Sequence, residues 1–167
     1  MMHCFIEGPI DETFFKHLFC GIEVEFYQYA NKPSIKVNQY IQTIKQLNEP
    51  YIFFADGDGA SYQAKKEKIL QKYSKLEPDH VFIVQFEIES WYLAGVNKVF
   101  CDKNKIKHYY KNTDSVTKEM FNEAIKTCNE TKLSIMLKML NIYDCLLADT
   151  RNTSFSSFFS KNMSICQ

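Results

Sequence analysis

Acidic residues follow three apolar, strand-like runs of this chain. They are Glu7 and Asp11 after the first run, Asp56 and Asp58 after the second, and Glu87 and Glu89 after the third. If the three runs are neighbouring parallel strands, these carboxylates gather at one edge of the sheet. Crowded carboxylates repel each other unless a cation lies among them. A divalent ion that prefers oxygen ligands, with magnesium first, meets this need, and metal-assisted phosphoryl chemistry is the leading hypothesis.

Ordinary structural roles compete with a metal-binding role at the first run. Asp11 is placed to begin a helix, where an acid caps free N–H groups and interacts well with the helix dipole. Glu7 has no such alternative, because it closes an apolar strand and has no helix end to cap. Gly8 directly after it allows a tight turn and the close approach of a ligand.

The other two acidic pairs also have structural alternatives. Asp56 and Asp58 follow a fully apolar run, and their placement at alternate positions, separated by one glycine, brings both carboxylates near one place. The alternative for this pair is a tight turn, in which Asp-Gly sequences are common. Glu87 and Glu89 are expected at the end of the fourth strand, where alternate positions point to the same side. The alternative for this pair is the charged first turn of a helix.

The pattern of apolar residues predicts which elements position these acids. Strands are expected at 2–6, 22–27, 51–55 and 81–86, and helices at 9–19, 37–47, 60–76, 117–128, 132–141 and 154–159. The strands alternate with helices before the chain ends in helices only. This order predicts an α/β fold with a central, mostly parallel four-stranded sheet, flanking helices and extra C-terminal helices. Ligands of such sheets bind beyond the carboxyl ends of the strands.

Size and composition describe an ordinary globular chain. Its 167 residues suit one domain, and 46% are apolar and 24% charged. Because 20 basic and 20 acidic side chains balance, the chain is not a globally basic nucleic-acid-binding protein. The six cysteines include no CxxC pair, which indicates free thiols in a reducing cytoplasm. No signal segment opens the chain and no apolar run approaches the ~20 residues that cross a bilayer.

Basic residues offer candidate contacts to phosphate groups. Lys65 and Lys66 belong to a lysine-rich helical stretch after the second acidic pair, and Arg151 is the only arginine. A guanidinium fork suits phosphate recognition, and lysine contacts to a nucleic-acid backbone would make binding salt-dependent. The alternative is that all three are ordinary surface residues.

These acidic residues make the chain resemble a TOPRIM domain, the metal-binding module of topoisomerases, primases and related nucleases. That family has a glutamate after its first strand, here Glu7, and an Asp-x-Asp after a later strand, here Asp56 and Asp58. The resemblance is strongest to small stand-alone TOPRIM-like proteins and to the TOPRIM part of the overcoming-lysogenization-defect nucleases. In those proteins the first motif reads Glu-Gly-x-x-acid, which Gly8 and Asp11 match.

Two more segments carry the resemblance. Residues 86–95 are similar to a Glu-Ile-Glu-(Ala/Ser)-Trp-Leu-Leu-Ala stretch, and residues 154–159 to a C-terminal Ser-Phe helix. The resemblance implies a single TOPRIM-like domain over 1–167, with a core of about 1–96 and a helical part of about 97–167. It implies Glu7, Asp56 and Asp58 as catalytic residues. The implied ligands of one or two Mg²⁺ or Mn²⁺ ions are Glu7, Asp11, Asp56, Asp58, Glu87 and Glu89.

The function implied is a metal-dependent nuclease that cleaves DNA or RNA by two-metal phosphoryl transfer, in defence against phage. The expected partners are nucleic acid and a second copy of the chain, but no membrane. Because no ATPase motif is present, a separate ATPase protein is also expected as a partner. Two alternatives stay open. One is a phosphatase of the haloacid-dehalogenase type that uses Asp56, because residues 56–60 imitate its Asp-x-Asp-Gly-Thr. The other is a non-catalytic module that binds metal or nucleic acid and acts with a partner protein.

Overall fold

The computed structural model describes residues 1–166, which divide into two compact units. The first unit covers residues 1–85, and the second covers residues 86–166. The division comes earlier in the chain than the boundary near residue 96 that the resemblance implied. Glu87 and Glu89 therefore belong to the second unit, and the other four candidate carboxylates belong to the first.

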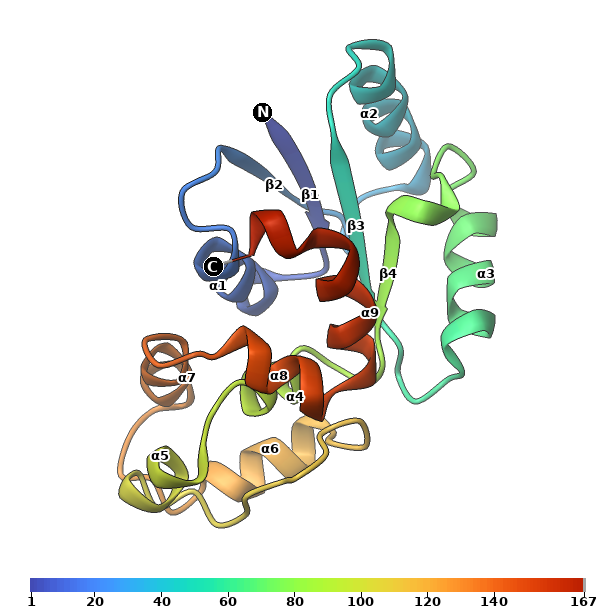
Figure 1. The fold of residues 1–167 in the computed structure, drawn as a ribbon. Coiled ribbons are helices and arrows are strands. Elements are labelled where there is room, and N and C mark those ends of the chain that lie inside the picture. The colour runs from blue at the N-terminus through green and yellow to red at the C-terminus, as the bar shows by residue number, and fades with distance from the viewer. Residues whose placement is uncertain (167) are drawn as a thin grey trace. The chain divides into compact units, whose positions relative to one another are not determined.

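The first unit contains all four strands of the sheet. Its elements are β1 (Met2–Ile6), α1 (Pro9–Leu18), β2 (Val24–Gln28), α2 (Ser34–Gln46), β3 (Tyr51–Asp56), α3 (Tyr62–Lys72), the 3-10 turn η1 (Pro78–His80) and β4 (Val81–Val84). The strands are all parallel and lie in the order β2-β1-β3-β4 (Figure 1). This confirms the parallel α/β fold that the alternation of strands and helices predicted.

The strand order changes direction at β1 and β3. After β1 the chain runs through α1 to β2 on one side, and after β3 it runs through α3 to β4 on the other. The two connections leave the carboxyl ends of β1 and β3 in opposite directions. In doubly wound sheets this divergence opens a crevice in which ligands bind. Glu7 and Asp56 stand at these two strand ends.

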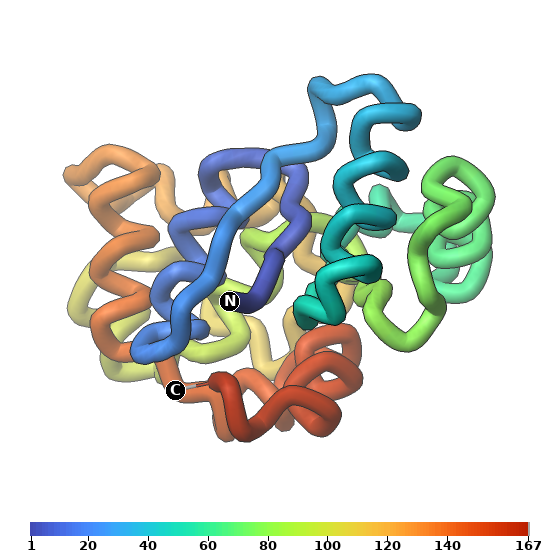
Figure 2. The backbone as a smooth tube through the Cα atoms, turned by 90° about the horizontal axis from the view of Figure 1, so that it is seen from above, coloured from blue at the N-terminus to red at the C-terminus, as the bar shows by residue number. Residues whose placement is uncertain are grey.

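Aromatic side chains hold β1 and β3 between helices. On one face, the rings of Phe5 and Phe53 stack with centroids 5.6 Å apart and belong to one core cluster with Ile41 of α2 and Ile69 of α3. On the other face, a ring of α1 stacks on Phe54. Figure 1 and Figure 2 show α2 and α3 together on the same side of the strands. Buried side chains on both faces of the sheet therefore fix the positions of β1 and β3.

The second unit is helical throughout its described residues. Its elements are α4 (Glu89–Ala94), α5 (Lys98–Lys103), α6 (Lys118–Ile125), α7 (Lys132–Leu140), α8 (Cys145–Arg151), α9 (Thr153–Asn162) and the 3-10 turn η2 (Met163–Ile165). Helices α5 to α9 each begin with an Asn, Thr or Asp whose side chain accepts a hydrogen bond from a first-turn N–H group. Among the described residues of both units, no helix is both long enough and apolar enough to cross a bilayer.

Helix α4 is the centre of the second unit, and all six of its residues are buried. It packs against α6, α7 and α8. Trp91 is fully buried, stacks on Phe158 and donates a hydrogen bond from Nε1 to Ser154 Oγ at 2.8 Å. Trp91 is thus a core residue of the second unit, and α9 packs against it.

The predicted end of the fourth strand was wrong. Strand β4 ends at Val84, and Glu89 is the first residue of α4. Glu87 and Glu89 therefore do not occupy alternate positions of an extended chain, as expected from the apolar run. The apolar residues after Val84 belong to the approach to a buried helix, and periodicity alone does not separate such a segment from a buried strand.

Candidate metal centre at the carboxyl edge of the sheet

Glu7 and Asp56 are neighbours although 49 residues separate them in the chain. Glu7 directly follows β1, and Asp56 is the last residue of β3. The backbone N–H of Asp56 donates a hydrogen bond to Glu7 Oε1 at 3.1 Å. The parallel pairing of β1 with β3 brings these two ends together, as the sequence predicted. The sheet thus presents two acidic residues at its switch point.

A tyrosine that the sequence pattern did not indicate completes this contact. Tyr29 directly follows β2 and is only 3% exposed. Its hydroxyl lies 3.1 Å from Glu7 Oε1 and 2.9 Å from the carbonyl oxygen of Phe54. Burial, together with the negative charge of Glu7, raises the pKa of Tyr29 well above its usual range, so the hydroxyl keeps its proton and donates it. In the sequence, only the position of Tyr29 after the second predicted strand could have indicated that it lies near Glu7.

Asp11 has a structural contact and also faces the same hollow. Its Oδ2 accepts a hydrogen bond from the Gly8 N–H at 2.8 Å, which is the helix-capping role considered for it above. Together with Glu7 and Asp56 it lines a narrow hollow in the first unit. The apolar part of the lining is Phe15, Phe54, Ala55 and Val84.

The donors of this hollow match a hard divalent ion in kind, because three carboxylates supply only oxygen ligands. Within residues 1–166, however, no three Asp, Glu, His or Cys side chains are arranged to hold an ion as they lie. One oxygen of Glu7 and one of Asp11 accept backbone hydrogen bonds, and a water-sized sphere does not fit into the hollow. The residues match a metal ion in chemistry and location, and binding one would require side chains to rotate.

Asp58 does not belong to the lining of this hollow. It lies in the turn after β3 with a φ of 52°, and its side chain is 69% exposed. It forms an ion pair with Lys65, whose Nζ lies 2.6 Å from Asp58 Oδ2. The Nζ of Lys66 lies 5.8 Å from the ring centroid of Tyr62. The predicted catalytic and metal-binding role of Asp58, and the predicted phosphate contacts of Lys65 and Lys66, stay predictions.

Glu87 and Glu89 both have structural partners in the second unit. Glu87 Oε2 accepts a hydrogen bond at 2.7 Å from the backbone N–H of Lys118, the first residue of α6. Glu89 Oε1 forms a 2.7 Å ion pair with Lys132 of α7, and the Glu89 side chain is only 4% exposed. Lys132 also lies over the ring of Phe121. These contacts stabilise the helical unit, and a metal-binding role of the two glutamates stays a prediction.

Glu89→Gln is expected to destabilise the protein without changing its response to metal. The amide keeps the shape of the side chain but removes the charge that faces Lys132, at a cost of about 2 kcal/mol. For a chain of this size the melting temperature falls by roughly 4–8 °C, measured by circular dichroism. Glu123→Gln, at an exposed ion pair of α6, is the control and should change the melting temperature little. Loss of a Mn²⁺-induced rise in melting temperature on Glu89→Gln would instead make Glu89 a ligand.

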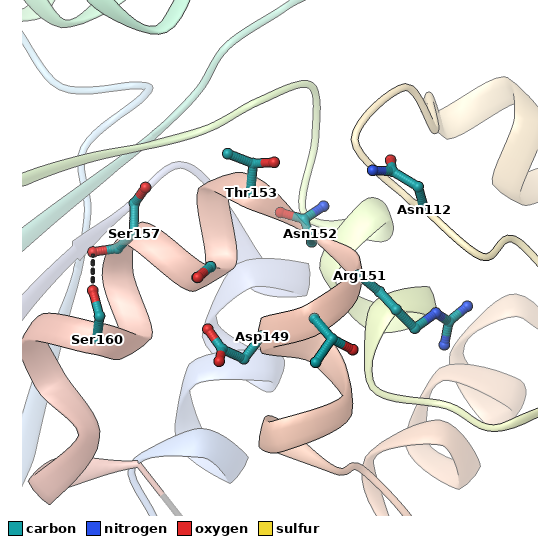
Figure 3. Close-up of a pocket in the computed structure, with 9 residues that line it drawn as sticks. Asn112, Asp149, Arg151, Asn152, Thr153, Ser157 and Ser160 are labelled. Atoms are coloured by element: carbon teal, nitrogen blue, oxygen red, sulfur yellow. Dashed lines mark hydrogen bonds between the residues drawn. The ribbon is translucent and has the colours of Figure 1, made fainter.

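Arg151 is buried and holds backbone groups of the second unit. It is 5% exposed, and its guanidinium donates hydrogen bonds to the carbonyl oxygens of Ala94, Val96 and Tyr110. A polar pocket of about 320 Å³ includes Arg151 in its lining, along with residues of α9. Figure 3 shows the guanidinium pointing away from Ser157 of that pocket. These contacts favour a structural role for Arg151 over the phosphate contact considered for it.

Arg151→Lys is expected to lower the melting temperature by roughly 4–8 °C, which corresponds to about 2 kcal/mol. Lysine keeps the charge but cannot bond several carbonyl oxygens in one plane as the guanidinium does. Thermal unfolding of the purified variant measures this loss. An unchanged melting temperature combined with weaker binding of nucleic acid would contradict the structural role and favour the phosphate contact.

Three of the six predicted carboxylates, Glu7, Asp11 and Asp56, thus share one hollow of the first unit. The fourth candidate acid of the first unit, Asp58, stands in an exposed turn, and the two candidate glutamates of the second unit have partners there. Comparison of the chain with protein-family models, with curated proteins and with solved structures found no match to any of them.

Proposed function

We propose that this chain is a metal-dependent phosphodiesterase that cleaves DNA or RNA, with Mg²⁺ or Mn²⁺ held by Glu7, Asp11 and Asp56. The observation that carries the proposal is the hydrogen bond from the Asp56 N–H to Glu7 Oε1. It joins two acids from distant parts of the chain at the switch point of a parallel sheet, where ligands of such sheets bind. The resemblance to TOPRIM domains adds the reaction class.

Each residue of the hollow has a distinct part in this proposal. Glu7 and Asp56 would bind the ion from the ends of two paired strands, and Asp11 from the first turn of α1. A bound ion would serve as a Lewis acid that polarises a phosphoryl oxygen and stabilises the negative charge developing there. Phe15 and Phe54 form an apolar wall beside the carboxylates and limit the access of water. Because these three residues lie at strand ends and in a helix, their positions are better defined than those of loop residues.

Lysines of α3 supply the positive charge that a nucleic-acid backbone would meet. The helix belongs to the same unit as the carboxylates and begins a few residues after Asp56. Its lysines are Lys65, Lys66, Lys68 and Lys72. Phosphate contacts from such a helix release counterions, so binding should weaken steeply as salt rises. Lys65 would have to leave Asp58 to take part.

The cellular setting in this proposal is the cytoplasm, with a separate ATPase protein or a second copy of the chain as partner. All six cysteines are free thiols, which supports a reducing compartment. Defence against phage, and the ATPase partner, rest on the resemblance to the larger nucleases alone.

The test is a cleavage assay on supercoiled plasmid, single-stranded DNA and RNA, with Mg²⁺ or Mn²⁺ and with EDTA as the control. Cleavage that needs the metal supports the proposal. Release of phosphate from p-nitrophenyl phosphate without cleavage of nucleic acid would indicate the haloacid-dehalogenase type of phosphatase instead. Binding of Mn²⁺ without turnover of any substrate would indicate a non-catalytic module.

A further inference from the structure

Tyr29 is fixed in the core directly beside Glu7. Its ring stacks on Phe53 with centroids 4.4 Å apart and meets the ring of Tyr73 edge to face at 5.6 Å. The side chain therefore has little freedom to move its hydroxyl. That hydroxyl reaches Glu7 Oε1 at 3.1 Å and the Phe54 carbonyl oxygen at 2.9 Å. The one hydroxyl hydrogen is shared between these two acceptors, and Oε1 is the only oxygen of the Glu7 carboxylate that it reaches among the described residues.

Two donors converge on the same oxygen of Glu7. The Asp56 N–H and the Tyr29 hydroxyl both lie 3.1 Å from Oε1. Among the described residues, both hydrogen bonds that the Glu7 carboxylate accepts are accepted by Oε1. A carboxylate whose one oxygen is held by two donors cannot rotate freely, and Oε2 is the oxygen that remains to bind a cation. Hydrogen bonds of this kind orient the ligands of metal sites.

We propose that Tyr29 is a positioning residue of the carboxylate site, which holds Glu7 by Oε1 so that Oε2 can bind the divalent ion. This inference rests on the proposed function, because it assigns a role to Tyr29 only if Glu7 is a metal ligand. Tyr29 itself touches neither the ion nor the substrate. Its contribution is the orientation of Glu7, and its removal should weaken the binding of metal more than the binding of nucleic acid.

The chain offers a matched control for this test. Tyr73 is also fully buried in the same core, and its hydroxyl has no hydrogen-bond partner among the described residues. Tyr29→Phe and Tyr73→Phe each remove one hydroxyl and keep the ring. Only Tyr29→Phe removes a contact to Glu7.

Titration of each purified variant with Mn²⁺, followed by the electron paramagnetic resonance of the free ion, measures the dissociation constant. Tyr29→Phe should raise it roughly tenfold, as is typical when a partner of a metal ligand is lost, and Tyr73→Phe should leave it within about twofold of wild type. In the cleavage assay, Tyr29→Phe should raise the Mn²⁺ concentration for half-maximal rate and leave KM for nucleic acid unchanged. A general loss of structure would move both quantities.

Each result decides between the two claims. A wild-type protein that binds no Mn²⁺ overturns the proposed function, and the role of Tyr29 with it. A wild type that binds Mn²⁺, with equal constants for the two Phe variants, overturns the role of Tyr29 alone. Should Tyr29→Phe not fold by circular dichroism, a Mn²⁺-soaked wild-type crystal answers the question. Glu7 turned away from Tyr29, or bound to the ion through Oε1, contradicts the inference.

Discussion

Glu7→Gln and Asp56→Asn are each expected to remove metal-dependent cleavage of nucleic acid while the protein stays folded. Each variant loses one negative charge from the hollow, and the loss of metal-ion stabilisation is worth about 3 kcal/mol or more. The rate should therefore fall on the order of a hundredfold or more. The Glu7→Gln side chain keeps an oxygen that can accept the hydrogen bonds of Asp56 and Tyr29, so we expect the local structure to be retained.

Cleavage rates at saturating Mn²⁺, with circular dichroism on the same samples, measure this effect. Glu67→Gln is the matched control, because Glu67 lies exposed on α3 in the same unit and is hydrogen-bonded to Gln63. It should cleave at the wild-type rate. Full activity of Glu7→Gln together with inactivity of Asp56→Asn would contradict a shared site and favour a phosphatase that uses Asp56 alone.

Gly57→Ala is expected to destabilise the first unit strongly. A Cβ atom at position 57 would lie 2.1 Å from the carbonyl oxygen of Gln85 and 2.8 Å from that of Val84. Both atoms are backbone at the end of β4, so neither can move cheaply. The Gly57 N–H also donates to the Val84 carbonyl at 2.7 Å, which ties the turn to this strand. We expect a cost of about 3 kcal/mol, or a melting temperature roughly 6–12 °C lower.

Gly8→Ala is the control for this prediction. A Cβ atom at position 8 meets nothing within 4 Å, and its φ of −155° is extended backbone that alanine adopts readily. Thermal unfolding of the two variants side by side should show a large fall for Gly57→Ala and little change for Gly8→Ala. Equal melting temperatures would mean that the turn after β3 is not packed against the end of β4.

The elements of the first unit were predictable because their local patterns are strong. The run 51–55 is entirely apolar, as a strand buried on both faces requires, and the helical spacing of apolar residues at 37–47 marks the buried face of α2. The meeting of Glu7 and Asp56 followed from the parallel order of the strands that precede them. Their contact also requires β1 and β3 to be neighbours in the sheet, which was assumed from the sequence and is shown by the structure.

Other features depend on contacts that no local pattern encodes. Tyr29 lies beside Glu7 because β2 pairs with β1 in one register, with Gln28 opposite Ile6. Glu89 looked like part of an acidic strand end, yet its partner Lys132 comes from a helix 43 residues later. The single arginine likewise suggested a ligand, and burial against carbonyl oxygens emerged only in three dimensions.

The most direct test of the account is an X-ray structure of the protein soaked in Mn²⁺, with data collected for the anomalous signal of manganese. We predict an anomalous peak in the hollow of the first unit, within coordination distance of the carboxylates of both Glu7 and Asp56. A fully occupied Mn²⁺ bound elsewhere on the protein, or a hollow that stays without anomalous density at saturating Mn²⁺, would contradict the shared metal site.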